Sequence, residues 1–147
     1  MKRFLRKKIT PENRSFKKIL RGFFVVMIQE IDFYTNKISF SASGETQKGT
    51  GRETNEDNFL IGSYYKKNCR AVNDTFCFTA PNRCRYSLFA VFDGMGGGPY
   101  GEYASLCAAE EFYNVHMKLH DMLSPEQVSC MVSDAFQTAN NRIIRSP

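Results

Sequence analysis

The sequence lacks the marks of several protein classes. Its five cysteines are odd in number and include no C-x-x-C pair, which argues against a disulfide framework and a zinc finger and favours reduced thiols in a cytoplasmic protein. The only candidate membrane segment, residues 19–28, is interrupted by Arg21 and is far shorter than the roughly 20 apolar residues that span a bilayer. Internal repeats and low-complexity tracts are also absent. No Gly-Lys-Ser/Thr sequence follows the glycines after Asp93, which excludes a nucleotide-binding P-loop there.

What is present is a hydrophobic chain with an uneven distribution of charge. Of its 147 residues, 42% are hydrophobic and 14% are aromatic, enough for the core of one globular domain. The formal net charge is +5, but residues 1–23 hold nine Lys and Arg against one Glu, so they carry +8 and the remainder carries −3. We therefore expect residues 1–36 to be a basic N-terminal extension, amphipathic or disordered, and we expect no nucleic acid partner. Weak contact of this extension with a membrane surface is the alternative.

Apolar periodicity predicts strands in the first part of the remaining domain, residues 37–147. Residues 37–43 alternate apolar and polar side chains, as in a half-buried strand, and residues 44–55 are polar and contain glycine, as in a loop. A second, short strand is predicted at 59–61, and residues 63–85 are interpreted as a peripheral hairpin. Residues 86–92 are almost continuously apolar, which predicts a strand buried on both faces.

Two helices are predicted after the strands. Apolar residues recur from residue 103 onward with helical spacing and form one face, which holds Ala104, Ala108, Phe112, Val115 and Leu119. The sequence Ser-Pro-Glu-Gln at residues 124–127 is typical of a capping box that starts a second helix. The inner face of that helix holds Val128, Val132, Ala135, Ala139 and Ile143. Because the connection is short, the two helices are expected to be antiparallel neighbours, and strands followed by a helix pair predict an α+β domain.

Three acidic residues mark the ends of two predicted strands. Glu56 and Asp57 come before the strand at 59–61, and Asp93 directly follows residues 86–92. If these strands are neighbours, the three carboxylates meet at one end of a sheet, where their repulsion requires a cation. Carboxylate oxygens together with the Gly94 carbonyl suit Mg²⁺ or Mn²⁺ rather than zinc.

The sequence Arg-x-x-Asn-Glu-Asp at residues 52–57, with Phe-Asp-Gly-Met-Gly-Gly at 92–97 and Gly101-Glu102 opening a helix, resembles two motifs of a known family. These are the first two motifs of the PPM-type (type 2C) metal-dependent Ser/Thr protein phosphatases, in the form common among bacterial members. The resemblance covers roughly residues 38–144 and implies an α-β-β-α sandwich whose two antiparallel sheets hold a pair of metal ions. For this chain it implies a partial sandwich flanked by the antiparallel helix pair and truncated at the C-terminus, because the family's later motifs are not in this sequence.

The resemblance also implies roles for individual residues. Asp93 matches the carboxylate that bridges both metal ions, and Glu56 and the Gly94 carbonyl match ligands of one of them. Asp57 matches the acid that hydrogen-bonds metal-bound water. Arg52 matches the arginine that binds the substrate phosphate, in keeping with the bidentate fit of a guanidinium group to phosphate oxygens. Two Mn²⁺ or Mg²⁺ ions are expected in a complete domain and at most one in this chain.

The expected activity is hydrolysis of phosphoserine and phosphothreonine in proteins by metal-activated water. The expected partners are a phosphoprotein substrate and, as a further candidate, a Ser/Thr kinase. Met95 stands where many eukaryotic relatives have a histidine proposed as general acid, so no residue here is a candidate for that role. The alternative function is a catalytically dead phosphatase-like module that binds phosphoproteins or regulates a partner. His116 and His120 lack the glutamate of a metalloprotease motif between them and are predicted to be solvated.

Overall fold

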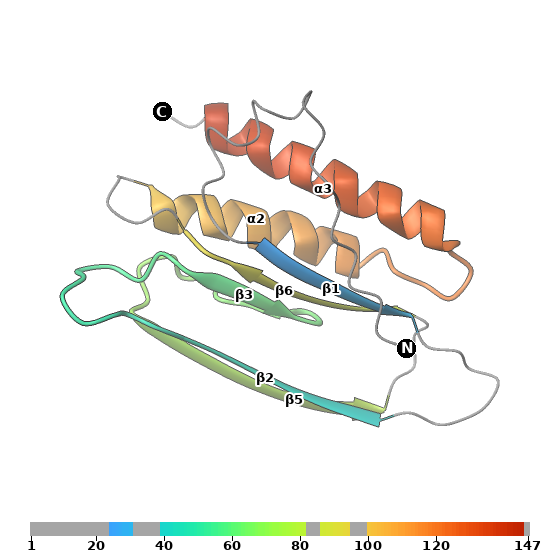
Figure 1. Ribbon diagram of the computed structural model, residues 1–147, viewed down its shortest axis with the longest axis horizontal. Coiled ribbons are helices and arrows are strands. Elements are labelled where there is room, and N and C mark those ends of the chain that lie inside the picture. Colours follow the sequence, from blue (N-terminus) through green and yellow to red (C-terminus); the bar gives the residue numbers. More distant parts are fainter. Residues whose placement is uncertain (1–23, 31–38, 82–85, 95–99, 146–147) are drawn as a thin grey trace.

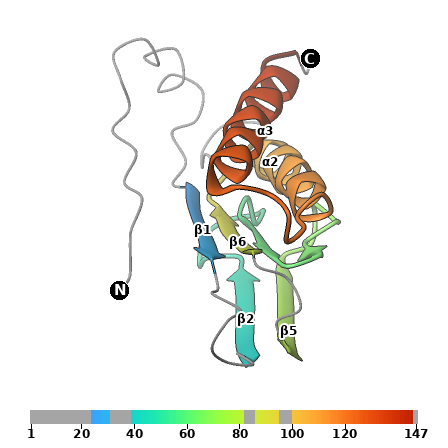
Figure 2. The same cartoon turned by 90° about the vertical axis from the view of Figure 1, so that its right-hand side faces the viewer.

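The computed structural model describes residues 24–30, 39–81, 86–94 and 100–145. Its elements form layers: a pair of helices, a four-stranded antiparallel sheet, and a two-stranded antiparallel sheet (Figure 1). In the view of Figure 2, helices α2 and α3 lie on the opposite side of the four-stranded sheet from β2 and β5. The predicted α+β class, with two antiparallel sheets and a packed helix pair, is therefore confirmed. No helix in the described ranges has the length and apolar character needed to cross a bilayer.

The four-stranded sheet is built from short elements in the order β1-β6-β3-β4. Its strands are β1 (Phe24–Glu30), β3 (Asn58–Ile61), β4 (Tyr64–Tyr65) and β6 (Tyr86–Phe92). The strands predicted at 59–61 and 86–92 are therefore present. Gly62 makes the tight turn between β3 and β4 with a φ of 58°, a left-handed conformation that glycine adopts without steric cost.

Strand β1 is a correction to the expected N-terminal extension. Residues 24–30 were included in the extension of residues 1–36, but they form an edge strand that pairs antiparallel with β6, from Phe24 opposite Phe92 to Glu30 opposite Tyr86. The prediction rested on the composition of residues 1–36 as a whole. The many basic residues before Phe24 dominate that composition and hide the short apolar strand. Residues 1–23 lie outside the described residues.

The two-stranded sheet differs from the expected loop and hairpin. Strand β2 (Ser39–Gln47) continues four residues beyond the predicted strand at 37–43, into the segment predicted as a loop. It does so because β5 (Asn73–Pro81) supplies backbone partners along its whole length, as far as Gln47 opposite Asn73. The segment 63–85 is therefore not a separate hairpin. Its first part joins the four-stranded sheet as β4, and β5 pairs with β2.

Helices α2 (Gly101–His116) and α3 (Pro125–Arg145) form the outer layer. The predicted capping box is confirmed: the backbone N–H of Ser124 donates to Gln127 Oε1 at 2.8 Å, and the N–H of Gln127 donates to Ser124 Oγ at 3.3 Å. Most residues of the two predicted faces are buried, namely Ala108, Phe112, Val115, Val128, Ala135 and Ala139. Arg142 of α3 also binds Glu110 and Glu111 of α2, at 2.7 and 2.6 Å, and ties the two helices together.

The core lies between the helices and the four-stranded sheet. Phe112 is fully buried and contacts the rings of Phe92 and Phe136, with centroids 5.4 and 4.8 Å away. The other members of this cluster are Leu60, Leu88, Ala90, Ala108, Ala109, Val115, Ala135 and Ala139. Burial of β6 on both faces was predicted, and this is wrong for Val91, which is 52% exposed. The physical reason is that β2 packs against β3 and leaves this position of β6 uncovered.

Candidate functional site

The residues predicted to hold a metal ion lie where β3 begins and β6 ends. These strands are antiparallel neighbours, and Asn58 at the start of β3 is opposite Phe92 at the end of β6. The segment before β3, which contains Glu56 and Asp57, therefore lies at the same end of the sheet as Asp93 and Gly94. The condition on which the metal-site hypothesis depended, that these two strands are neighbours, is met.

The two segments touch at Gly94. Its backbone N–H donates a hydrogen bond to Asp57 Oδ1 at 3.2 Å. A Cβ atom added to Gly94 would lie 2.2 Å from the carbonyl oxygen of Glu56 and 2.7 Å from its Cβ, distances that real structures do not tolerate. Glycine is therefore required at this position by close backbone packing, because any side chain would push the Glu56 segment away.

The acidic side chains differ in burial. Glu56 is only 8% exposed, and its Oε2 atom is buried without a hydrogen-bond partner. Asp57 is half-buried, and Asp93 is exposed. Arg52 lies four residues before Glu56 in the chain, and its Nη1 atom is 3.7 Å from Glu56 Oε2. The Arg52 side chain is nevertheless 58% exposed. The structure thus brings Arg52, Glu56, Asp57 and Gly94 together, and Asp93, which precedes Gly94 in the chain, is more exposed than Glu56 and Asp57.

Glu56 gives the test of whether a metal ion fits. A buried carboxylate oxygen without a donor is costly, and a cation is one way to satisfy it. Within the described ranges, however, no three His, Cys, Asp or Glu side chains are close enough to form a ready ligand group. A divalent ion bound here would therefore have Glu56 as its side-chain ligand and would take its remaining ligands from backbone or water.

Asn55 fixes the loop that carries Glu56 and Asp57, and its role was missed from the sequence. It is 3% exposed, and its Nδ2 atom donates to Thr46 Oγ1 at 3.0 Å and to the Val72 carbonyl at 2.9 Å. Its Oδ1 atom accepts from the backbone N–H of Asp57 at 3.1 Å. The amide thus connects β2, the segment before β5 and the acidic pair. The motif contains Asn55, but nothing in the sequence indicates these partners.

Lys66 was also missed, although its long side chain is fully buried, at 1% exposure. Its Nζ atom donates to the Asn55 carbonyl at 2.9 Å. Burial lowers the pKa of Lys66, and the nearby Asp57 and Asp74 carboxylates oppose that change. Nothing in the sequence indicates that this position is buried, because the adjacent lysines Lys66 and Lys67 are typical of a solvated surface.

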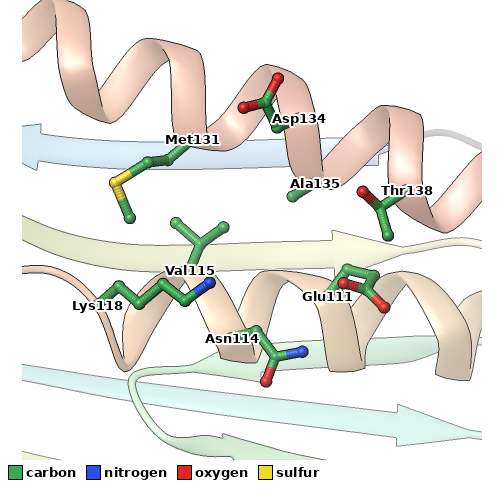
Figure 3. Close-up of a pocket in the computed structure, with 8 residues that line it drawn as sticks. All are labelled: Glu111, Asn114, Val115, Lys118, Met131, Asp134, Ala135 and Thr138. Atoms are coloured by element: carbon green, nitrogen blue, oxygen red, sulfur yellow. The ribbon is translucent and has the colours of Figure 1, made fainter.

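A cavity of about 160 Å³ lies elsewhere, between α2 and α3 (Figure 3). It is lined by Glu111, Asn114, Val115 and Lys118 from α2 and the turn after it, and by Met131, Asp134, Ala135 and Thr138 from α3. None of the residues at the ends of β3 and β6 reaches it, so it is a gap between helices and not part of the candidate site.

Comparison of the chain with models of protein families, with curated proteins and with solved structures gave no match. The functional argument therefore depends on the residues and geometry of the site itself. The glycines at 96 and 97 and Met95, which belong to the second motif, lie outside the described residues.

Proposed function

We propose that this chain carries part of the active site of a metal-dependent protein Ser/Thr phosphatase, which hydrolyses phosphoserine and phosphothreonine with metal-activated water. The observation that supports the proposal is the packing of the two motif segments against each other: Gly94 donates to Asp57 and leaves no space for a side chain against Glu56. Two separate sequence motifs with the residue types of a phosphatase thus meet at one end of the four-stranded sheet. A surface loop with ordinary solvated acids has no reason to bury Glu56 in this way.

Each residue has a distinct task in this proposal. Glu56 supplies a buried carboxylate oxygen for one Mn²⁺ or Mg²⁺ ion, and a bound ion contributes Lewis acidity that activates water and offsets phosphoryl charge. Asp57 keeps one oxygen on the Gly94 N–H and offers the other to a water molecule. Arg52 is exposed beside Glu56, where its guanidinium group can pair with the oxygens of an incoming phosphate. The partners implied are a phosphoprotein substrate and the kinase that phosphorylates it.

A phosphatase-like binding module without catalysis is the second candidate. It is favoured by the exposed position of Asp93 and by the lack of a three-acid group among the residues that the structure describes. Arg52 would then bind phosphate on a partner protein without hydrolysis. Both candidates predict that the chain binds a phosphopeptide and that this binding requires Arg52. They differ in whether the bound phosphate is then hydrolysed.

The test combines calorimetric titration with Mn²⁺ and a phosphopeptide assay on the whole chain. We expect one Mn²⁺ site, with affinity at least about tenfold weaker in Glu56→Gln, because a buried charged ligand is lost. Glu53→Gln is the matched control, since Glu53 is exposed in the same loop, and its affinity should change less than about twofold.

Slow phosphate release that Asp93→Asn abolishes would support the phosphatase over the binding module. Phosphopeptide binding that Arg52→Ala abolishes, without any phosphate release, would favour the module. Equal Mn²⁺ affinity in Glu56→Gln and Glu53→Gln would contradict the proposed metal site.

A further inference from the structure

Lys66 forms a closed set of hydrogen bonds around the acidic segment. Asn58 holds its backbone from both sides: the Lys66 N–H donates to Asn58 Oδ1 at 2.9 Å, and Asn58 Nδ2 donates to the Lys66 carbonyl at 2.9 Å. The Lys66 side chain then turns back, and its Nζ atom donates to the Asn55 carbonyl at 2.9 Å. Residues 55–58, which include both acids, are thus bracketed by one buried lysine.

A buried ammonium group is unfavourable unless it is compensated. Here the compensation comes from one backbone carbonyl and from nearby carboxylates that favour the charged form, namely Asp57, Asp74 and Glu102. These carboxylates come from the acidic segment, from β5 and from the first turn of α2. A hydrophobic side chain would fill the same space at lower cost, so the charge itself calls for an explanation.

We propose that Lys66 is a fixed internal cation for the acidic site: it positions residues 55–57 through the Asn55 carbonyl, and its charge weakens the binding of a divalent ion at Glu56. This inference rests on the proposed metal site. The ammonium group attracts Asp57 and so offsets part of the negative charge of the acidic segment when no metal is bound. The same positive charge repels a second cation that approaches Glu56, which makes the site preformed but weak.

The inference predicts an effect opposite in sign to that of a purely structural lysine. Lys66→Gln removes the charge and keeps an amide donor, and we expect it to bind Mn²⁺ about fivefold more tightly than the wild-type chain, since one nearby positive charge is gone. Lys66→Met also removes the hydrogen bond that positions the loop, so it should lower the melting temperature without metal more than Lys66→Gln does. If Lys66 only packed the loop, both variants would bind Mn²⁺ more weakly.

Lys67→Gln is the matched control. Lys67 is the next residue along the chain and is exposed, so the loss of its charge is screened by water and should change Mn²⁺ affinity less than about twofold. The measurements are Mn²⁺ titration by calorimetry and thermal unfolding by circular dichroism, both on the full chain. A Lys66 variant that is unfolded without metal is titrated by circular dichroism, and recovery of the fold with Mn²⁺ supports the inference, because a metal ion then replaces the lost cation.

The outcomes separate the two proposals. Tighter binding in Lys66→Gln than in Lys67→Gln supports the internal cation. Equal or weaker binding, or an unfolded variant that Mn²⁺ does not restore, overturns it and leaves the proposed function in place if the wild-type chain binds Mn²⁺. Absence of Mn²⁺ binding in the wild-type chain and in every Lys66 variant overturns both.

Discussion

The two sheets of this protein are stabilised in different ways. In the four-stranded sheet, Leu60, Leu88 and Phe92 are at most 1% exposed because helices cover one face. In the two-stranded sheet, Ser41, Ser43, Glu45 and Gln47 of β2 and Thr75 and Cys77 of β5 are exposed. Burial of apolar surface is the main source of stability, so the first sheet should carry most of the free energy of folding. The second sheet depends on a few contacts with the first.

Those contacts are specific. A Cβ atom at Gly44 of β2 would lie 2.8 Å from side-chain atoms of Phe59 and Ile61, so this glycine lets the two sheets approach. The Tyr64 ring of β4 stacks on Phe76 of β5 with centroids 4.0 Å apart. Its hydroxyl donates to Asp74 at 2.7 Å, and this bond raises the pKa of Tyr64 to about 12. Asn55 adds a third connection, and the candidate site therefore lies at the junction of a stable layer and a weakly held one.

The largest effect is expected in the helix-covered layer. Phe112→Ala removes a ring that is fully buried against Phe92 and Phe136, and it should lower the free energy of unfolding by about 3–5 kcal/mol. Thr75→Ala on the exposed face of β5 should cost less than about 0.5 kcal/mol. Urea unfolding measures both, and similar losses in the two variants would remove the proposed contrast between the sheets.

The contact between the sheets should be intermediate in importance. Gly44→Ala places a methyl group against the Phe59 and Ile61 side chains, and we expect a loss of about 1–3 kcal/mol from overpacking. Gly49→Ala is the control, because nothing lies within 4 Å of the added Cβ. If Gly44→Ala is as stable as Gly49→Ala in urea unfolding, the two sheets are held together more loosely than the structure indicates.

The capping box should contribute less to the free energy of unfolding than the buried core does. Ser124→Ala removes the Oγ acceptor for the Gln127 N–H and should lower the free energy of unfolding by about 1 kcal/mol. Ser129→Ala, on an exposed position of the same helix, should be neutral within about 0.5 kcal/mol. If both variants lose the same free energy of unfolding, the loss is a general effect of replacing serine by alanine in this helix and does not come from the cap.

The smallest effect should be a pH dependence that belongs to the helix-covered layer. His116 is not solvated as predicted: it is half-buried, its Nδ1 atom is buried without a hydrogen-bond partner, and burial lowers its pKa below the ordinary 6.5. The unfolded chain then binds a proton more readily than the folded chain. The His116 contribution is complete above about pH 6.5, the unfolded value, and is lost progressively as the pH falls below it toward the folded pKa.

His116→Asn should therefore show a shallower fall in melting temperature between about pH 7 and pH 5 than the wild-type chain. His120→Asn is the matched control, since His120 is exposed and should leave the slope unchanged. Equal slopes in all the proteins would contradict the burial of His116.

Local patterns predicted the helical layer better than the sheets. The capping box at 124–127 and the apolar faces of α2 and α3 depend on residues three or four apart, and the structure confirms most of them. The burial of Val91 and the extent of β2 were predicted wrongly because they depend on which strand lies opposite. β1 was missed for the same reason, since only its pairing with β6 distinguishes residues 24–30 from the segment before them.

The sequence by itself determined the residue types of the candidate site, the α+β order of elements and the helix pair, because these follow from short-range periodicity and from motifs that are contiguous in the chain. Only the tertiary structure decided that Gly94 packs against Glu56, that Asp93 is exposed, and that Lys66 is buried beneath the acidic loop. Burial and charge compensation depend on groups distant in the sequence, such as Asn55 and Asp74 around Lys66. A lysine surrounded in sequence by polar residues shows no sign of this environment until the strands are paired.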